Sequence, residues 1–330
     1  MAHLDRAHRF PEAPGDPSTR ARQDVAAPEL SASLAQEVVP AAVSANGKTP
    51  SPGGPEQRKS RAGRNLPAAI GVGAGLGGLV IVSLFVYKWL FLGLIIAAVV
   101  IGSWEMVRAV SVQKARPPLV PLLLGGPLMV CLAWFGGADD LPLGLLATLL
   151  AIFIWRFAAG APHYQRDVTA GALIAVYVPF LGSFAALLAY PAEDGSVRVL
   201  VTILAVVLSD TGGYVTGVFL GRHPMAPSVS PAKSWEGFAG SVVWTGAGSA
   251  VAVSLLLDDA VWWHGAVFGV AVSIASVLGD LGESLIKRDL GVKDMSNLLP
   301  GHGGLMDRLD SVLLALPTAY AVLAFLVPPW

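Results

Sequence analysis

The sequence predicts an all-α polytopic membrane protein with about nine transmembrane helices and a disordered N-terminal tail. This prediction depends on the composition, on the regular spacing of long apolar runs and on the placement of basic residues between them. The chain is 54% hydrophobic and 14% charged, with a mean hydropathy of +0.62. Soluble domains typically have about 45–50% apolar and about 25% charged residues. The composition therefore excludes an ordinary soluble protein and favours an integral membrane protein.

Residues 1–63 differ from the rest of the chain. They are rich in Pro, Ala, Ser, Gly and charged residues, and they contain few aromatic residues. A segment of this kind cannot bury enough apolar surface to offset the entropy that is lost on ordering. We therefore expect 1–63 to form a disordered cytoplasmic tail. We expect no signal peptide, because the first long apolar run begins near Leu66.

Beyond the tail, apolar runs of about 20 residues alternate with short polar connections. A helix of that length spans a hydrocarbon core of roughly 30 Å, so each run is a candidate transmembrane helix. The first two runs are separated only by the sequence YKW, and a single re-entrant hairpin is the alternative for this pair. The nine predicted spans are 66–86, 89–108, 118–136, 141–159, 168–190, 197–219, 237–257, 261–286 and 305–327.

Basic residues gather in alternate connections, as the positive-inside rule describes for polytopic proteins. The basic set comprises Arg58, Lys59, Arg61, Arg64, Arg108, Lys114, Arg116, Arg156, Arg166, Arg222, Lys233, Lys287, Arg288 and Lys293. The opposite connections contain Lys88 and Arg198 but are otherwise acidic, with Asp139, Asp140, Glu193, Asp194, Asp258 and Asp259. This alternation predicts a cytoplasmic N-terminus, an external C-terminus, and two unusual cytoplasmic loops at 220–236 and 287–304.

Acidic side chains occur at the ends of the last two predicted spans. Asp280, Glu283, Ser284 and Lys287 follow the spacing i, i+3, i+4 and i+7, which places them on one helix face. Asp307 and Asp310 open the next span at i and i+3. Ionisable groups at membrane depth are costly and usually face the protein interior or a wet cavity. Two such helix ends, joined by one loop, can share a cation, and a small number of hard oxygen ligands suits Mg²⁺.

The connecting loop supplies the opposite charge. Its cationic side chains are of the type that binds phosphate groups, and they are Lys287, Arg288, Lys293, His302 and Arg308. Gly303 and Gly304 end the PGHGG turn before a helix N-terminus, where backbone N–H groups bind anions. This combination indicates phosphoryl-group chemistry. Taken singly, the basic residues also suit positive-inside or headgroup contacts, and Asp307 and Asp310 also suit a helix N-terminus.

The stretch from Ser284 to Asp310 resembles the characteristic motif of the phosphatidate cytidylyltransferases, also called CDP-diacylglycerol synthases. The matching residues are Ser284, Lys287, Arg288, Lys293, Asp294, Ser296, Leu299, Pro300, His302, Gly303, Gly304, Asp307, Arg308 and Asp310. Two further segments are similar to the family, SDTGGY around Asp210 and SPAKSWEG around Lys233. In these segments Gly213 stands where the family often has Ala, and Ser234 where it has Thr.

The resemblance implies the reaction of CTP with phosphatidate to give CDP-diacylglycerol and pyrophosphate, with Mg²⁺, alone or together with a second cation, as the expected cofactor. The expected catalytic residues are Asp280, Asp307, Lys287, Arg288 and Ser284. The expected phosphate-binding residues are Lys233, Lys293, His302, Gly303, Gly304 and Arg308. The expected metal ligands are Asp280, Asp307, Asp310 and Asp210.

Two other functions are left open by the residues alone. A CTP-dependent polyprenol or phytol kinase would use the same kind of site to transfer the γ-phosphate. A cation-coupled transporter would use Asp210 and Asp280 as ion sites within the membrane. We expect residues 64–190 to form a scaffold of transmembrane helices that supports a homodimer, and 191–330 to form the catalytic region. The expected setting is the plasma membrane, with a cytoplasmic active site and no nucleic-acid partner.

Overall fold

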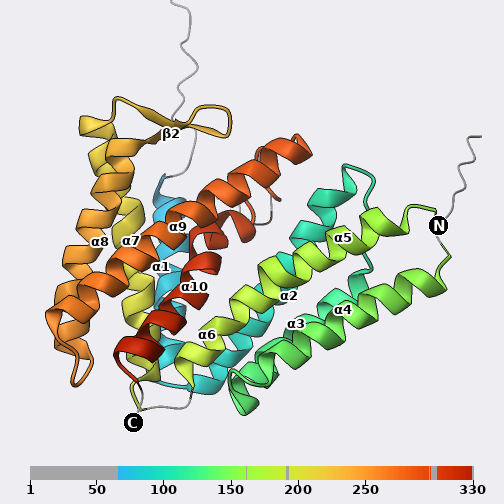
Figure 1. Ribbon diagram of the computed structural model, residues 1–330, viewed down its shortest axis with the longest axis horizontal. Coiled ribbons are helices and arrows are strands. Elements are labelled where there is room, and N and C mark those ends of the chain that lie inside the picture. The colour runs from blue at the N-terminus through green and yellow to red at the C-terminus, as the bar shows by residue number, and fades with distance from the viewer. Residues whose placement is uncertain (1–65, 161, 191–192, 297, 299–302, 329–330) are drawn as a thin grey trace, which may run out of the picture. The chain divides into compact units, whose positions relative to one another are not determined.

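The computed structural model describes residues 66–328 except positions 161, 191–192, 297 and 299–302. The predicted tail at 1–63 and His302 lie outside the described residues. The described part is almost entirely helical (Figure 1). Its helices are α1 (Leu66–Phe85), α2 (Lys88–Ser111), α3 (Leu119–Gly136), α4 (Leu141–Ala158), α5 (Tyr164–Ala175), η1 (Val176–Phe180), α6 (Leu181–Ala189), α7 (Gly195–Leu220), α8 (Trp235–Leu256), α9 (Trp262–Leu290) and α10 (Met306–Leu326).

The predicted membrane fold is confirmed. Eight helices of the described part are long and apolar enough to cross a membrane, with α5, η1 and α6 counted as one continuous helix from Tyr164 to Ala189. These eight run from α2 to α10, and α1, the 20-residue helix at the first predicted span, is not among them. Only Val86 and Tyr87 separate α1 from the 24-residue α2. A separate crossing by α1 therefore stays a prediction, with a re-entrant hairpin as its alternative.

A π-helical turn interrupts the helix between α5 and α6. It contains Pro179, which has no backbone N–H to donate to the preceding turn. A π-helical turn accommodates such a break and is often found near functional sites. Tyr177 belongs to this turn, so its side chain is displaced from the regular α-helical positions.

The helices α7 to α10 pack closely through small residues. On α9, an added Cβ at Gly269 would lie 2.4 Å from the Thr245 carbonyl oxygen of α8. An added Cβ at Gly279 would lie 2.4 Å from the Asp310 carbonyl oxygen of α10. Lipid chains are as apolar as the side chains they would replace, so helices in a membrane associate through such close packing. The glycines therefore set the spacing of α9 from its two neighbours.

A short antiparallel hairpin interrupts the helical pattern between α7 and α8. It consists of β1 (Pro224–Ala226) and β2 (Ser230–Ser234), and Figure 1 shows it beyond the ends of these helices. The Arg288 Nε atom at the end of α9 donates to the Val229 carbonyl oxygen over 3.1 Å. The hairpin therefore contacts the same end of the bundle as the last turn of α9.

The connections gather at the two ends of the bundle in the order that the charge pattern predicts. At one end, Gln113 after α2 donates to the Asp289 carbonyl oxygen of α9 over 3.2 Å. At the opposite end, Ser196 donates to the Leu84 carbonyl oxygen, and Arg198 donates to the Val327 carbonyl oxygen, both over 2.7 Å. The connections that were predicted to share one side of the membrane therefore lie at a common end.

We expect the substitution Gly269→Ala to destabilise the protein, because the new methyl group would collide with a backbone oxygen that cannot move alone. Overpacking of this kind costs about 1–3 kcal/mol, which exceeds the gain in helix propensity of roughly 1 kcal/mol from Gly to Ala. The measurement is the thermal unfolding midpoint in detergent. Gly282→Ala is the matched control on α9, because an added Cβ there meets nothing within 4 Å. Equal midpoints for the two variants would contradict the close crossing.

Candidate active site

A cavity of about 540 Å³ lies among α7, β2, α8, α9 and α10. It contains most of the acidic residues that the sequence singled out. The predicted site residues in its lining are Asp210, Lys233, Asp280, Asp307, Arg308 and Asp310. Ser209, Ser234, Ser241 and Ser311 add hydroxyl groups to the same lining. The predicted metal ligands thus share one cavity, although they come from three helices.

The carboxylates meet because of how α9 and α10 cross. Gly279, the residue before Asp280, allows the backbone of α9 to approach that of α10 at Asp310. Asp310 interacts electrostatically with both Asp280 and Asp210. The Ser311 hydroxyl, 3.4 Å from the Asp210 carboxylate, connects α10 to α7. Negative charge is therefore concentrated on one wall of the cavity, which favours binding of a cation.

Lys233 brings a positive charge to this wall from the hairpin. Its Nζ atom lies 2.6 Å from the Asp280 carboxylate. The adjacent Ser234 holds this part of the chain in place, since its hydroxyl accepts a hydrogen bond from the Gly237 N–H at the start of α8. Glu236 accepts from the N–H groups of Arg222 and His223 and so closes the base of the hairpin. The SPAKSWEG segment is thus a helix start that directs one lysine into the cavity.

Lys287 has a different environment from the one that the sequence suggested. Its Nζ atom lies 3.1 Å from the Glu283 carboxylate and 2.9 Å from the Asp307 carboxylate. Glu283 is completely buried, and only 16% of the Lys287 side chain is exposed. Lys287 does not line the cavity. It joins α9 to the start of α10 and places one positive charge between the Glu283 and Asp307 carboxylates.

The Asp307 carboxylate also has its hydrogen-bond partners within the protein. Besides Lys287, its carboxylate accepts from the N–H groups of Met295 and Gly304, over 3.1 Å and 2.8 Å. Gly303 precedes this contact with a φ of 78°, a conformation that favours glycine. Asp307 therefore fixes the loop before α10 in place. The Gly304 N–H, which was expected to face a phosphate, donates to Asp307 instead.

The remaining predicted residues lie around the cavity. The Ser284 hydroxyl is 3.4 Å from the Asp280 carboxylate and is a neighbour of the cavity wall. Arg288 and Lys293 are exposed, and Arg288 binds the hairpin. These two cations are available to groups that approach from outside.

Two residues near the site come from 64–190, the predicted scaffold, where sequence reasoning placed no site residue. Glu105 on α2 is fully buried and accepts hydrogen bonds from Ser296, Leu305 and Met306. Tyr177 on η1 has a buried hydroxyl group with no hydrogen-bond partner in the described part of the chain. That side chain interacts electrostatically with Glu283, Asp310 and Asp280. The one available signal was an acid, Glu105, within an otherwise apolar span.

The donor chemistry of the cavity fits Mg²⁺. Across the described positions of 66–328, no group of three or more His, Cys, Asp and Glu side chains is already arranged around a metal position. Such a cage is not required, because Mg²⁺ usually takes one or two protein carboxylates and completes its coordination with water and substrate phosphates. Asp210, Asp280 and Asp310 supply hard oxygen atoms on one wall, and their mutual repulsion would fall on cation binding.

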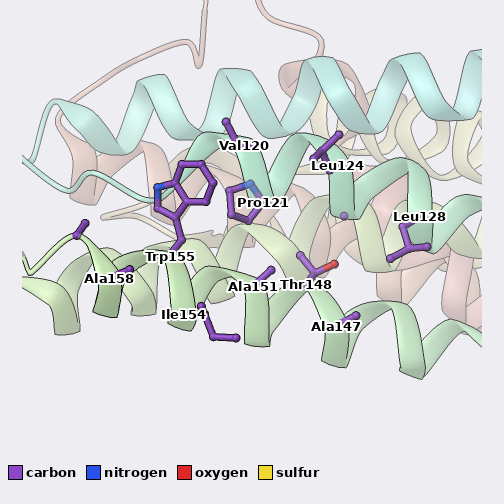
Figure 2. Close-up of a pocket in the computed structure, with 12 residues that line it drawn as sticks. Val120, Pro121, Leu124, Leu128, Ala147, Thr148, Ala151, Ile154, Trp155 and Ala158 are labelled. Carbon is purple, nitrogen blue, oxygen red and sulfur yellow. The ribbon is translucent and has the colours of Figure 1, made fainter.

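A second cavity, of about 740 Å³, lies between α3 and α4 and has a different character (Figure 2). Figure 2 shows the Trp155 ring beside Pro121, in a lining that is otherwise apolar except for Thr148. Its only hydroxyl group, on Thr148, donates to the Gly144 carbonyl oxygen. None of the predicted site residues that the structure describes lines this cavity. Its surface suits lipid chains rather than phosphate chemistry.

Comparison with known proteins agrees with the geometry. The sequence model of the cytidylyltransferase family matches residues 68–326. The chain is 43% identical over 282 residues to the phosphatidate cytidylyltransferase of Mycobacterium leprae, covering 81% of this chain and 90% of the relative. It is 42% identical to the protein of that name from Mycobacterium tuberculosis (82% and 86% covered) and 30% identical to that from Pseudomonas aeruginosa (79% and 96% covered).

We expect Lys287→Met to destabilise the protein strongly, because it leaves Glu283 buried without its cation. Removal of one partner from a buried pair costs about 3–5 kcal/mol. The double substitution Glu283→Gln with Lys287→Met should recover much of this loss. Arg288→Met, at the neighbouring exposed position, is the control and should have little effect on stability. Unfolding midpoints of the three variants and the wild-type protein test this, and equal losses for Lys287→Met and Arg288→Met would contradict it.

Proposed function

Because the chain belongs to the cytidylyltransferase family, we propose that it is an integral membrane phosphatidate cytidylyltransferase, a nucleotidyltransferase of phospholipid synthesis. Its reaction converts CTP and phosphatidate into CDP-diacylglycerol and pyrophosphate. The observation that carries this proposal is the cavity among α7, α9 and α10, which four carboxylates line and in which Lys233 pairs with Asp280. Such a cavity suits a reaction between two polyanions.

In this reaction a phosphate oxygen of phosphatidate attacks the α-phosphorus of CTP. A new P–O bond forms, and the bond from the α-phosphorus to the bridging oxygen breaks, so that pyrophosphate leaves with the bond electrons. The attacking oxygen is already an anion, so no strong general base is needed. The main requirement is to position two negatively charged groups and to reduce their repulsion.

The basic residues of the cavity are suited to bind the substrate phosphates, and its acidic residues are suited to bind the cation. Lys233 and Arg308 would neutralise substrate phosphates, with Arg288 and Lys293 assisting at the exposed edge. Asp210, Asp280 and Asp310 would hold Mg²⁺, and Asp307 would act by keeping the loop before α10 in place. When bound, Mg²⁺ supplies positive charge to the reacting phosphates. The Ser284 hydroxyl would orient the Asp280 carboxylate that it contacts.

The comparisons do not favour a CTP-dependent lipid kinase, since the related proteins carry the cytidylyltransferase name. The two activities differ in their products. The cytidylyltransferase forms pyrophosphate and CDP-diacylglycerol, whereas the kinase forms CDP and a lipid phosphate. We place the enzyme in the plasma membrane with the cavity open to the cytoplasm, as the distribution of basic residues predicts. A homodimer through the helices of 64–190 is part of the same proposal.

We expect purified protein with CTP, phosphatidate and Mg²⁺ to release pyrophosphate and form CDP-diacylglycerol, and chelation of the metal to stop both. Asp280→Asn should lower turnover by about 10²-fold or more, because it weakens the cation site and removes the partner of Lys233. Asp289→Asn, also on α9 but exposed, is the matched control and should keep full turnover. CDP as the nucleotide product would instead support the kinase. Full turnover of Asp280→Asn would contradict the role assigned to this residue.

The proposed orientation is testable because the chain has a single cysteine, Cys131. In a Cys131→Ala background, we expect a membrane-impermeant maleimide to label Asp258→Cys in intact cells. Ser228→Cys should be labelled only after the cells are permeabilised. Both positions are exposed, at opposite ends of α8. The reverse labelling pattern would place the cavity on the external side.

A further inference from the structure

Glu105 lies in the N-terminal half of the chain, yet its side chain binds the loop that leads into α10. Its carboxylate accepts hydrogen bonds from the Ser296 hydroxyl over 2.6 Å, the Leu305 N–H over 3.0 Å and the Met306 N–H over 2.8 Å. The residue is completely buried, so these contacts are shielded from water. Hydrogen bonds to an ionised acceptor are about twice as strong as those between neutral groups.

These contacts supply what the start of α10 lacks. The first N–H groups of a helix have no partner within it and are usually satisfied by a capping side chain. The residue before α10 is Leu305, which has no polar side-chain atom. Glu105 takes the place of the cap from another helix, and its negative charge lies at the positive end of the α10 dipole.

Two glycines beside Glu105 leave room for this contact. An added Cβ at Gly304 would lie 2.8 Å and 3.0 Å from the two Glu105 carboxylate oxygens. One turn earlier on α2, an added Cβ at Gly102 would lie 3.0 Å from the Met306 sulfur atom. Both glycines therefore allow α2 and the start of α10 to approach closely. Gly304 thereby has a packing role independent of any phosphate.

The first turn of α10 carries residues of the cavity. Asp307 and Arg308 follow Met306 directly, and Asp310 lies one turn after it. A shift of about 1 Å in a reacting group can lower a rate by about 10²-fold. From this geometry we infer that Glu105 is a positioning residue that holds the start of α10, and with it the cavity side chains, in their active arrangement. The inference depends on the proposed function and gives α2 a positioning role in catalysis.

The central test is Glu105→Gln. The amide keeps the size of the side chain but replaces one acceptor oxygen with a donor NH₂ group, so at least one of the three contacts is lost. We expect kcat for CDP-diacylglycerol formation to fall by about 10–10²-fold. We also expect faster trypsin cleavage after Lys293, which is exposed in the same loop. Ser296→Ala removes one of the three donors and should show smaller changes in the same direction.

Asp167→Asn is the matched control. Asp167 is another buried acid of the predicted scaffold, and it accepts from the Arg116 N–H over 2.6 Å and from Arg156, away from the cavity. It should lower the unfolding midpoint without changing kcat at a temperature where the protein is folded, or the cleavage after Lys293.

The outcomes separate this inference from the proposed function. Wild-type kcat and unchanged cleavage in folded Glu105→Gln would overturn the inference, and so would an equal loss of kcat in Asp167→Asn. If wild-type protein forms no CDP-diacylglycerol, the proposed function fails, and the cleavage assay still tests whether Glu105 holds the loop. If Glu105→Gln does not fold, Ser296→Ala decides in its place.

Discussion

A charged side chain inside an apolar helical bundle needs a partner, and this constraint governs the region around the cavity. An isolated charge at membrane depth costs several kcal/mol or more. Lys287 pairs with Glu283 and Asp307, and Lys233 pairs with Asp280. The Lys287–Glu283 pair lies within α9. The Lys287–Asp307 and Lys233–Asp280 pairs join elements that are separate in the chain, so these two contacts also fix the relative positions of β2, α9 and α10. Asp210 and Asp310, by contrast, interact as like charges, which is where a bound cation would be most favourable.

The helical architecture could be predicted from the sequence because membrane spans depend on local composition and length. The shared cavity of Asp280, Asp307 and Asp310 could also be anticipated, since helical periodicity places each acid on a face and a short loop joins the two helices. What periodicity cannot give is the direction in which a face points. Lys287 was expected to bind phosphate, which stays a prediction, and its Nζ atom lies between the Glu283 and Asp307 carboxylates. The i,i+4 spacing of Glu283 and Lys287 was the available signal for that pair.

Contacts between distant parts of the chain were harder to anticipate. Glu105 is separated from its three donors by about 190–200 residues, and no local pattern connects them. Tyr177 interacts electrostatically with Glu283, Asp310 and Asp280 from within a π-helical turn, which regular helical periodicity does not describe. The N-terminal helices were accordingly predicted to be a scaffold. The structure brings two of their side chains to the edge of the catalytic region.

The length of α9 has a consequence for how a lipid could reach the cavity. Its 29 residues extend for about 44 Å, or about 41 Å along the membrane normal at a tilt of 20°, whereas the hydrocarbon core is roughly 30 Å thick. About two turns of the helix must therefore extend beyond the hydrocarbon core, either at one membrane boundary or divided between the two. The Asp280–Leu290 segment lies at the end of α9 that contacts the hairpin, and in the proposed orientation this end would lie near the cytoplasmic phospholipid headgroups. A membrane-bound phosphate group could meet a water-soluble nucleotide there with its acyl chains still in the bilayer, so the lipid would not have to be extracted before it reacts.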